Sequence, residues 1–194
     1  MHTWPLSLRE GNLELRSLQR GDRRAVEQMR RRNEHHLRPW DATDPERPGA
    51  RPTFRALRRW AERQGKTGLT LHLLIVHEGN TVGQIMAGPI LYGSLRTATI
   101  GYWVDEQHCG QGIATRALAL LEQHLFDEMG MHRIELTVRP ENEASLAVVR
   151  KAGLRCEGLR ERAVHVDGAW RDHLVFARTV EETRTLQDDI PHGS

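Results

Sequence analysis

The stretch CGQGIATRAL, residues 109–118, follows an apolar, strand-like segment (TATIGYWV, 97–104) and opens a run of alanine and leucine with helical spacing. Gly110 and Gly112 stand one residue apart in it. A helix that begins directly after them has free backbone N–H groups in its first turn, at the positive end of its dipole. Because glycines carry no side chain, a phosphate oxygen can reach those groups. The turn therefore predicts a phosphate-binding site, to which Thr115 adds a hydroxyl.

Two common phosphate-binding motifs do not fit this turn. A P-loop ends in Gly-Lys-Ser/Thr, whereas Gly112 is followed by Ile113 and Ala114. A dinucleotide fingerprint needs a third glycine and an acidic residue about 20 positions further on, at the end of a second parallel strand. Ala114 does not supply that glycine, and residues 97–104 resemble the last strand of a meander. The glycines alone leave the phosphate ligand open.

The rest of the chain predicts one mixed α/β domain. Alternating or β-branched runs predict strands, and apolar stripes with a 3.6-residue period predict helices. Gly79-Asn80 predicts a hairpin turn between two apolar runs. The expected order is β-α-α-β-β-β-α-β-α-β-β, with elements near residues 13–18, 21–40, 54–64, two runs within 69–90, 97–104, 112–130, 132–140, 141–153 and a hairpin within 154–179. This order predicts a mostly antiparallel sheet of about seven strands with helices on both faces, over residues 1–180, and a flexible tail over 181–194.

The composition narrows the class of protein. A chain of 194 residues with 38% hydrophobic content can bury one core. Cys109 and Cys156 are too few for a disulfide framework or a metal cluster, and the 11 histidines lack paired-ligand spacing, so we expect no metal. We find no signal-like or membrane-spanning apolar run, which favours a soluble, cytoplasmic protein without a membrane partner.

Charge is unevenly distributed along the chain. Residues 1–66 hold 16 Lys and Arg against 9 Asp and Glu, whereas the remaining residues hold 12 against 17. The excess suggests an acidic or phosphate-bearing partner near the N-terminal half, although a solvated arginine-rich face also explains it. Base-stacking aromatics are few and no nucleic-acid reading motif is present, so direct nucleic-acid binding is not expected.

Over roughly residues 12–180 the sequence resembles the GNAT superfamily of acetyl-CoA-dependent N-acetyltransferases. Within it, the chain is most similar to the Rim-type (RimJ/RimL-like) ribosomal-protein N-terminal acetyltransferases. The most specific matches are IGYWVDEQHCGQGIATRAL (100–118), MHRIELTV (131–138) and RPENEASLAVVRKAGL (139–154). The family's acetyl-CoA motif is Gln/Arg, two residues, Gly, one residue, then Gly/Ala. Residues 109–114 match all but the first position, where Cys109 stands; residues 107–112 match every letter but place the turn two residues earlier.

The resemblance implies where acetyl-CoA binds. Backbone amides of the turn would wrap the CoA pyrophosphate, namely those of Cys109, Gly110, Gln111, Gly112, Ile113, Ala114 and Thr115. The fourth strand, ending at Trp103 and Val104, would splay from the fifth, and pantetheine would lie in the gap. A backbone N–H near Trp103 or Val104 would polarise the acetyl carbonyl, as an oxyanion hole does.

The PENEAS segment adds a second set of candidates. Asn142 and Ser145 are three residues apart, so both can lie on one face at the start of a short helix, and both are ordinary capping residues. The resemblance matches Asn142 to a pantetheine-binding asparagine and Ser145 to a serine that contacts the sulfur and protonates the leaving thiolate. Lys151 and Arg150 either reach a CoA phosphate or form a basic helix end.

The general base is the least defined part of the site. Close relatives carry a glutamate nineteen positions after the matched serine, where this chain has Val164. Glu135 is our first choice instead, because its strand lines the family's cleft, although a salt-bridged structural role fits it too. The other candidates are Glu161, His165 and Asp172. A Cys109 nucleophile with His108 as base is disfavoured, because adjacent residues on a strand-like segment point to opposite sides.

The expected reaction is direct transfer of acetyl from acetyl-CoA to a primary amine in a ternary complex. At pH 7 roughly 10–15% of a free α-amine is already neutral, against about 0.04% of a lysine side chain, so a protein N-terminus demands little of the base. That acceptor is favoured. A small-molecule amine, another acyl donor such as succinyl-CoA, or a catalytically weak CoA-binding module are the alternatives, and the protein is expected to be a monomer or homodimer.

Overall fold

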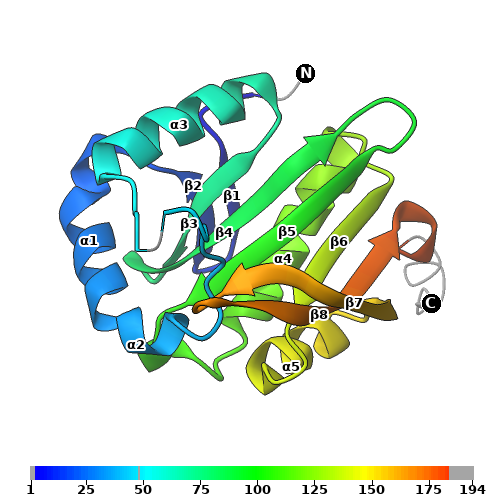
Figure 1. Cartoon of the computed structure of the whole chain (residues 1–194). Helices are drawn as coiled ribbons and strands as arrows, with labels where there is room; N and C mark the ends of the chain where they lie inside the picture. The colour runs from blue at the N-terminus through cyan, green and yellow to red at the C-terminus, as the bar shows by residue number, and fades with distance from the viewer. Residues whose placement is uncertain (1–2, 48, 184–194) are drawn as a thin grey trace.

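The computed structural model describes residues 3–47 and 49–183, and an open sheet organises them (Figure 1). Its strands follow the order β1-β2-β3-β4-β5-β6-β8-β7, and every neighbouring pair is antiparallel except β5 and β6. The mostly antiparallel mixed sheet of the sequence-based prediction is thus confirmed. The strands are β1 (Ser7–Glu10), β2 (Leu13–Ser17), β3 (Leu71–His77), β4 (Asn80–Leu91), β5 (Thr97–Val104), β6 (Arg133–Val138), β7 (Arg155–Val166) and β8 (Ala169–Thr179).

Helices cover both faces of this sheet (Figure 1). One face carries α1, α2 and α3, and the other carries α4 and α5, with a π-helical segment (His124–Glu128) continuing α4. β3 is buried from both sides, and its residues 73–76 are therefore apolar without alternation. The helices are α1 (Arg23–Arg32), α2 (Glu34–Leu37), α3 (Phe54–Thr67), α4 (Ile113–Gln123) and α5 (Glu143–Lys151).

The two parallel strands separate after a short contact. β5 pairs with β6 only at residues 97–99, against residues 133–135. Beyond Thr99, the β6-facing edge of β5 has no strand partner in the described ranges. These are the fourth and fifth strands of the sequence-based prediction, so the expected splay between them is confirmed. The end of β5 that is not paired with β6 lies beside the starts of α4 and α5.

The structure differs from the expected elements in three places. Residues 7–10 form an eighth strand, which pairs with β2 across a tight turn at Gly11 (φ +56°). The expected helix over 21–40 breaks at Asn33, whose buried side chain contacts the end of β5. Residues 180–183, partly assigned to the tail, are helical, and the remaining tail residues 184–194 lie outside the described residues. None of the helices within the described ranges is long and apolar enough to cross a membrane.

Candidate active site

A cavity of about 520 Å³ lies where β5, α4 and α5 meet the segment that follows α2. It gathers residues that are distant in the sequence, and most of the predicted cofactor-binding residues line it. These are Trp103, Val104, Cys109, Gly110, Gly112, Ile113, Ala114, Thr115, Asn142, Ser145 and Lys151. Gln111 and Glu135 do not line it.

The glycine turn presents an open helix N-terminus to this cavity. Gly110 and Gly112 have φ of +76° and +75°, a region that L-residues rarely adopt, and Gly112 is the N-terminal cap of α4. Among the described residues, no side chain caps this helix, and a Cβ on either glycine would meet no atom within 4 Å apart from its chain neighbours. The first free amides of α4 and the space before them fit a diphosphate. Lys151, at the end of α5, lines the same cavity.

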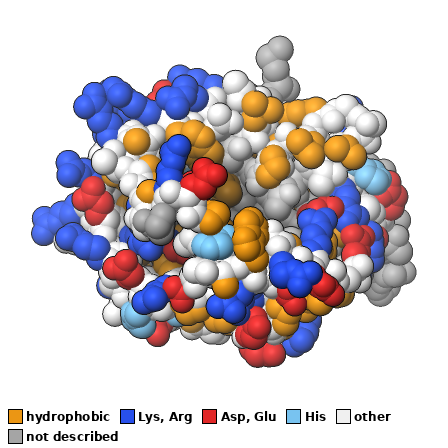
Figure 2. Space-filling view, in the orientation of Figure 1, with side chains coloured by type: hydrophobic (Ala, Val, Ile, Leu, Met, Phe, Trp, Pro, Cys, Tyr) orange, Lys and Arg blue, Asp and Glu red, His pale blue; other side chains and the backbone are white. Residues whose placement is uncertain are grey.

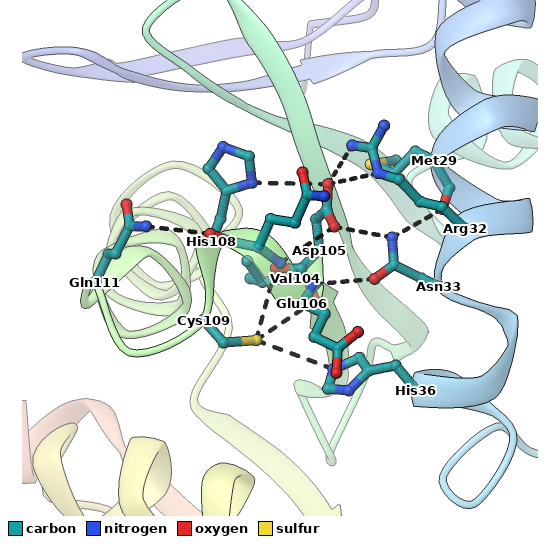
Figure 3. Close-up of polar contacts among 11 residues, drawn as sticks. Met29, Arg32, Asn33, His36, Val104, Asp105, Glu106, His108, Cys109 and Gln111 are labelled. Carbon is teal, nitrogen blue, oxygen red and sulfur yellow. Dashed lines mark hydrogen bonds and ion pairs between the residues drawn. The ribbon is translucent and has the colours of Figure 1, made fainter.

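A buried carboxylate fixes the chain just before this turn (Figure 3). The side chain of Asp105 is 1% exposed, forms an ion pair with Arg32 and accepts a hydrogen bond from Asn33 Nδ2 at 3.0 Å. Asn33 Oδ1 in turn accepts from the Glu106 backbone N–H at 2.8 Å. Burial disfavours the charged carboxylate, but the hydrogen bonds from Arg32 and Asn33 outweigh it and hold the pKa of Asp105 below its ordinary value. The break between α1 and α2 thereby positions the turn that the sequence predicts to bind phosphate.

We expect Asp105→Asn to lower the free energy of unfolding at pH 7 by about 1–3 kcal/mol, because the ion pair with Arg32 loses its charge partner. The folded-state pKa of Asp105 is lowered, so its contribution is complete above the unfolded pKa of about 3.9 and is lost as pH falls through the folded value. The difference between wild type and variant in urea unfolding should therefore narrow below about pH 4. The exposed Asp127→Asn should change stability by less than about 0.5 kcal/mol. A difference independent of pH would contradict the role given to the Asp105 charge.

The start of α5 brings Asn142 and Ser145 to the cavity wall. Asn142 Oδ1 accepts a hydrogen bond from the Ser145 backbone N–H at 3.0 Å, so asparagine is a helix cap and a lining residue at once. Tyr102, on β5, lines the wall beside Ser145. Burial raises the pKa of Tyr102 to about 12, and the Ser145 side chain opposes part of that rise. The Tyr102 hydroxyl is thus a protonated group next to the predicted position of the thioester sulfur.

The candidate bases hold structural contacts. Glu135, 19% exposed, accepts from Arg133 Nε at 2.9 Å and lies 3.6 Å from Arg160. Its catalytic role stays a prediction. His165 Nδ1 is hydrogen-bonded to the Thr43 hydroxyl at 2.8 Å, and the carboxylate of Asp172 accepts from the backbone of Arg162 at 2.7 Å. Glu161 lies 3.7 Å from the Arg162 guanidinium.

Cys109 lies at the rim of the cavity in an environment that favours the thiol. Its Sγ is 4.0 Å from His36 Nε2, and His108, the base of the disfavoured alternative, is directed toward Asp105 (Figure 3). Burial and the nearby carboxylates of Glu106 and Asp105 raise the pKa of the Cys109 thiol. A nucleophilic cysteine needs a lowered pKa, so these contacts oppose a ping-pong mechanism.

Sequence reasoning missed the other wall of the cavity. His36, Leu37, Trp40 and Asp41, from α2 and the segment after it, line this side. Asp41 forms an ion pair with Arg30, whose guanidinium lies 5.4 Å from the centre of the Trp103 ring. The segment also contacts the chain directly after β6 through Arg139, and the C-terminal hairpin through His165. The sequence of the loop after α2 does not predict a role in the site, because its proline, aspartate and glycine residues are typical of any loop.

The splayed parallel pair beside an open helix N-terminus is the architecture expected of a GNAT domain, and comparison with known proteins agrees. The family model for the acetyltransferase (GNAT) domain matches residues 12–155, so the chain belongs to this family. A structure of Mycobacterium smegmatis RimJ in complex with CoA-disulfide superposes with a TM-score of 0.87 at 38% identity, over 92% of this chain and 90% of that one.

Two curated relatives illustrate the range of similarity. The probable N-acetyltransferase YjcK of Bacillus subtilis is 42% identical over 96 residues, which span 50% of this chain and about half (53%) of that protein. The ribosomal protein uS5-alanine N-acetyltransferase of Escherichia coli is 24% identical over 152 residues, covering 77% of this chain and 78% of that enzyme.

Proposed function

We propose that this protein is an N-acetyltransferase that moves the acetyl group of acetyl-CoA to a primary amine, with a protein N-terminal α-amine as the favoured acceptor. The observation that carries the proposal is the single cavity that joins the open N-terminus of α4 to an aromatic and acidic wall. The similarity to RimJ and to the uS5-alanine enzyme supports a ribosomal-protein-like acceptor. The reaction proposed is direct attack in a ternary complex.

In the part of the cavity proposed to bind acetyl-CoA, backbone N–H groups and side chains have different roles. Free amides after Gly110 and Gly112 bind the CoA pyrophosphate, and Lys151 adds a positive charge. A backbone N–H at Trp103 or Val104 stabilises the oxyanion that forms on the acetyl carbonyl. Ser145 gives a proton to the departing thiolate.

Two carboxylates line the cavity, Asp41 in the segment after α2 and Glu143 at the start of α5. Asp41 is 25% exposed there, and Arg30 holds it in place. We assign Asp41 to binding the incoming ammonium. Loss of its proton needs no strong base, because a free α-amine has a pKa of about 7.7–8.0. Glu135 remains the sequence-predicted base, acting through water, and its carboxylate is already engaged by Arg133.

A thiol-release assay with acetyl-CoA tests this function. Peptides with a free N-terminus should be acetylated, and the same peptides with a blocked N-terminus should not. Asp41→Asn should raise the KM for the peptide about tenfold, because a charge-assisted hydrogen bond of about 1.5 kcal/mol is lost, and leave the KM for acetyl-CoA unchanged. Asp44→Asn, an exposed carboxylate in the same loop, serves as the matched control. CoA binding without turnover on any amine would instead identify a CoA-binding module, and turnover only on small amines would refute the protein acceptor.

A further inference from the structure

The basic N-terminal half forms a surface that the acetyl-transfer site does not use. Six arginines on two helices and the turn before α1 are exposed and have no ion pair or hydrogen bond from the side chain to the described residues. We call this set the arginine face. It consists of Arg20, Arg24, Arg31, Arg55, Arg59 and Arg63.

The spacing of these arginines places them together. Arg24 and Arg31 are seven residues apart on α1, and Arg55, Arg59 and Arg63 follow one another at intervals of four on α3, so each set lies along one side of its helix. At 1.5 Å per residue, each row extends over roughly 10–12 Å. The two helices contact each other, and Figure 2 shows Lys and Arg side chains gathered over them at the upper left.

Neighbouring basic residues on the same helices are already neutralised. Arg23 pairs with Glu27, and Glu62 pairs with both Arg58 and Lys66. Arg30 pairs with Asp41 in the cavity wall, and Arg32 pairs with the buried Asp105. The carboxylates of α1 and α3 therefore pair with basic residues outside the arginine face. The positive charge of the arginine face is not neutralised by them.

The side chains of the arginine face indicate which class of partner can bind there. The large apolar side chains of α1 and α3 are turned toward the sheet, and none of them is exposed beside the arginines. A folded protein partner ordinarily needs an apolar centre, and a single-stranded nucleic acid needs aromatic stacking platforms. A double-helical phosphate backbone needs only correctly placed positive charge, and arginine binds phosphate bidentately.

We propose that the arginine face binds the phosphate backbone of a double-helical nucleic acid without reading its sequence. None of the six arginines lines the acetyl-transfer cavity, so a bound duplex would leave that cavity open. The expectation against nucleic-acid binding rested on few aromatics and no reading motif, and backbone contacts require neither. The proposal does not depend on the acetyltransferase function.

The test is a fluorescence titration of the full chain with a mixed-sequence RNA duplex and a DNA duplex of the same length. Binding should weaken steeply with salt. Two double variants, Arg24→Gln/Arg31→Gln and Arg55→Gln/Arg59→Gln, should each weaken binding about tenfold and reduce the salt slope by about 2, since each phosphate contact contributes about 0.9. Whether RNA or DNA binds more tightly identifies the natural duplex.

The control must distinguish an effect of the arginines' position from an effect of the protein's net charge. Arg96→Gln/Arg162→Gln removes the same charge from exposed positions on other parts of the surface, and should change affinity less than twofold. Acetylation of a short peptide and thermal unfolding should be unaltered in both arginine-face variants, which establishes that they fold. Equal weakening by the control pair, no binding to either duplex at low salt, or tighter binding to polyglutamate of matched charge would each overturn the proposal.

Discussion

Gly112→Leu should raise the Kd for CoA by at least about 100-fold, equivalent to about 2.7 kcal/mol. Gly112 has φ of +75° and caps the N-terminus of α4, and the position of its missing Cβ faces open space. A leucine there must adopt a backbone region that costs roughly 1–2 kcal/mol, and its side chain would project into the space before the free amides. The pyrophosphate could no longer reach them. Calorimetric titration with CoA measures the change.

Gly79→Leu is the matched control for this result. Gly79, in the turn between β3 and β4, has φ of +79° and equally open surroundings, so the backbone cost is the same. Both variants should lose similar thermal stability, and only Gly112→Leu should lose CoA affinity. Retained CoA affinity in Gly112→Leu would place the cofactor elsewhere in the molecule.

The donor half of the site could be predicted from the sequence because it depends on local signals. Glycines between a strand pattern and a helix pattern define an open helix N-terminus, and their neighbours within a few residues line the cavity. Helix capping predicts the positions of Asn142 and Ser145 at the start of α5, whereas their assignment to the cofactor came from the resemblance to the GNAT family. Much of the strand order in the sheet depends on local signals too, because hairpin turns join most pairs of adjacent strands.

The acceptor half depends on contacts across the fold, which one sequence does not reveal. Asn33 breaks an otherwise continuous helical pattern because Asp105, 72 positions away, accepts its hydrogen bond. Asp41 stands in a loop whose composition predicts only a turn, and it reaches the cavity because the chain is held by Pro39 and Thr43. Glu135 alternates correctly on its strand, yet the arginine two residues before it takes one of its carboxylate oxygens.

The end of β5, where we propose that the acetyl carbonyl is polarised, packs closely against a glycine on the neighbouring strand. Gly83 on β4 pairs with Val104, and a Cβ there would clash with the Trp103 carbonyl oxygen and lie 3.1 Å from Val104 Cα. Gly83→Ala must therefore shift the end of β5, where the oxyanion-stabilising N–H is proposed. A displacement of about 1 Å at a reacting centre costs on the order of 100-fold in rate, so kcat should fall by about that factor. The Kd for CoA should change only a few-fold, because the pyrophosphate-binding amides belong to α4 and do not move.

Gly88→Ala distinguishes this effect from lost stability. Gly88 is on the same strand, and its Cβ would lie 2.7 Å from the side chain of Thr70, away from the cavity. Both substitutions overpack a closely fitted strand and should destabilise the protein by roughly 1–3 kcal/mol. When kcat is measured at a temperature well below the unfolding temperatures of both variants, only Gly83→Ala should reduce it. If the two variants lose activity equally, the rate depends on the rigidity of the sheet as a whole, and the end of β5 has no special role in polarising the acetyl group.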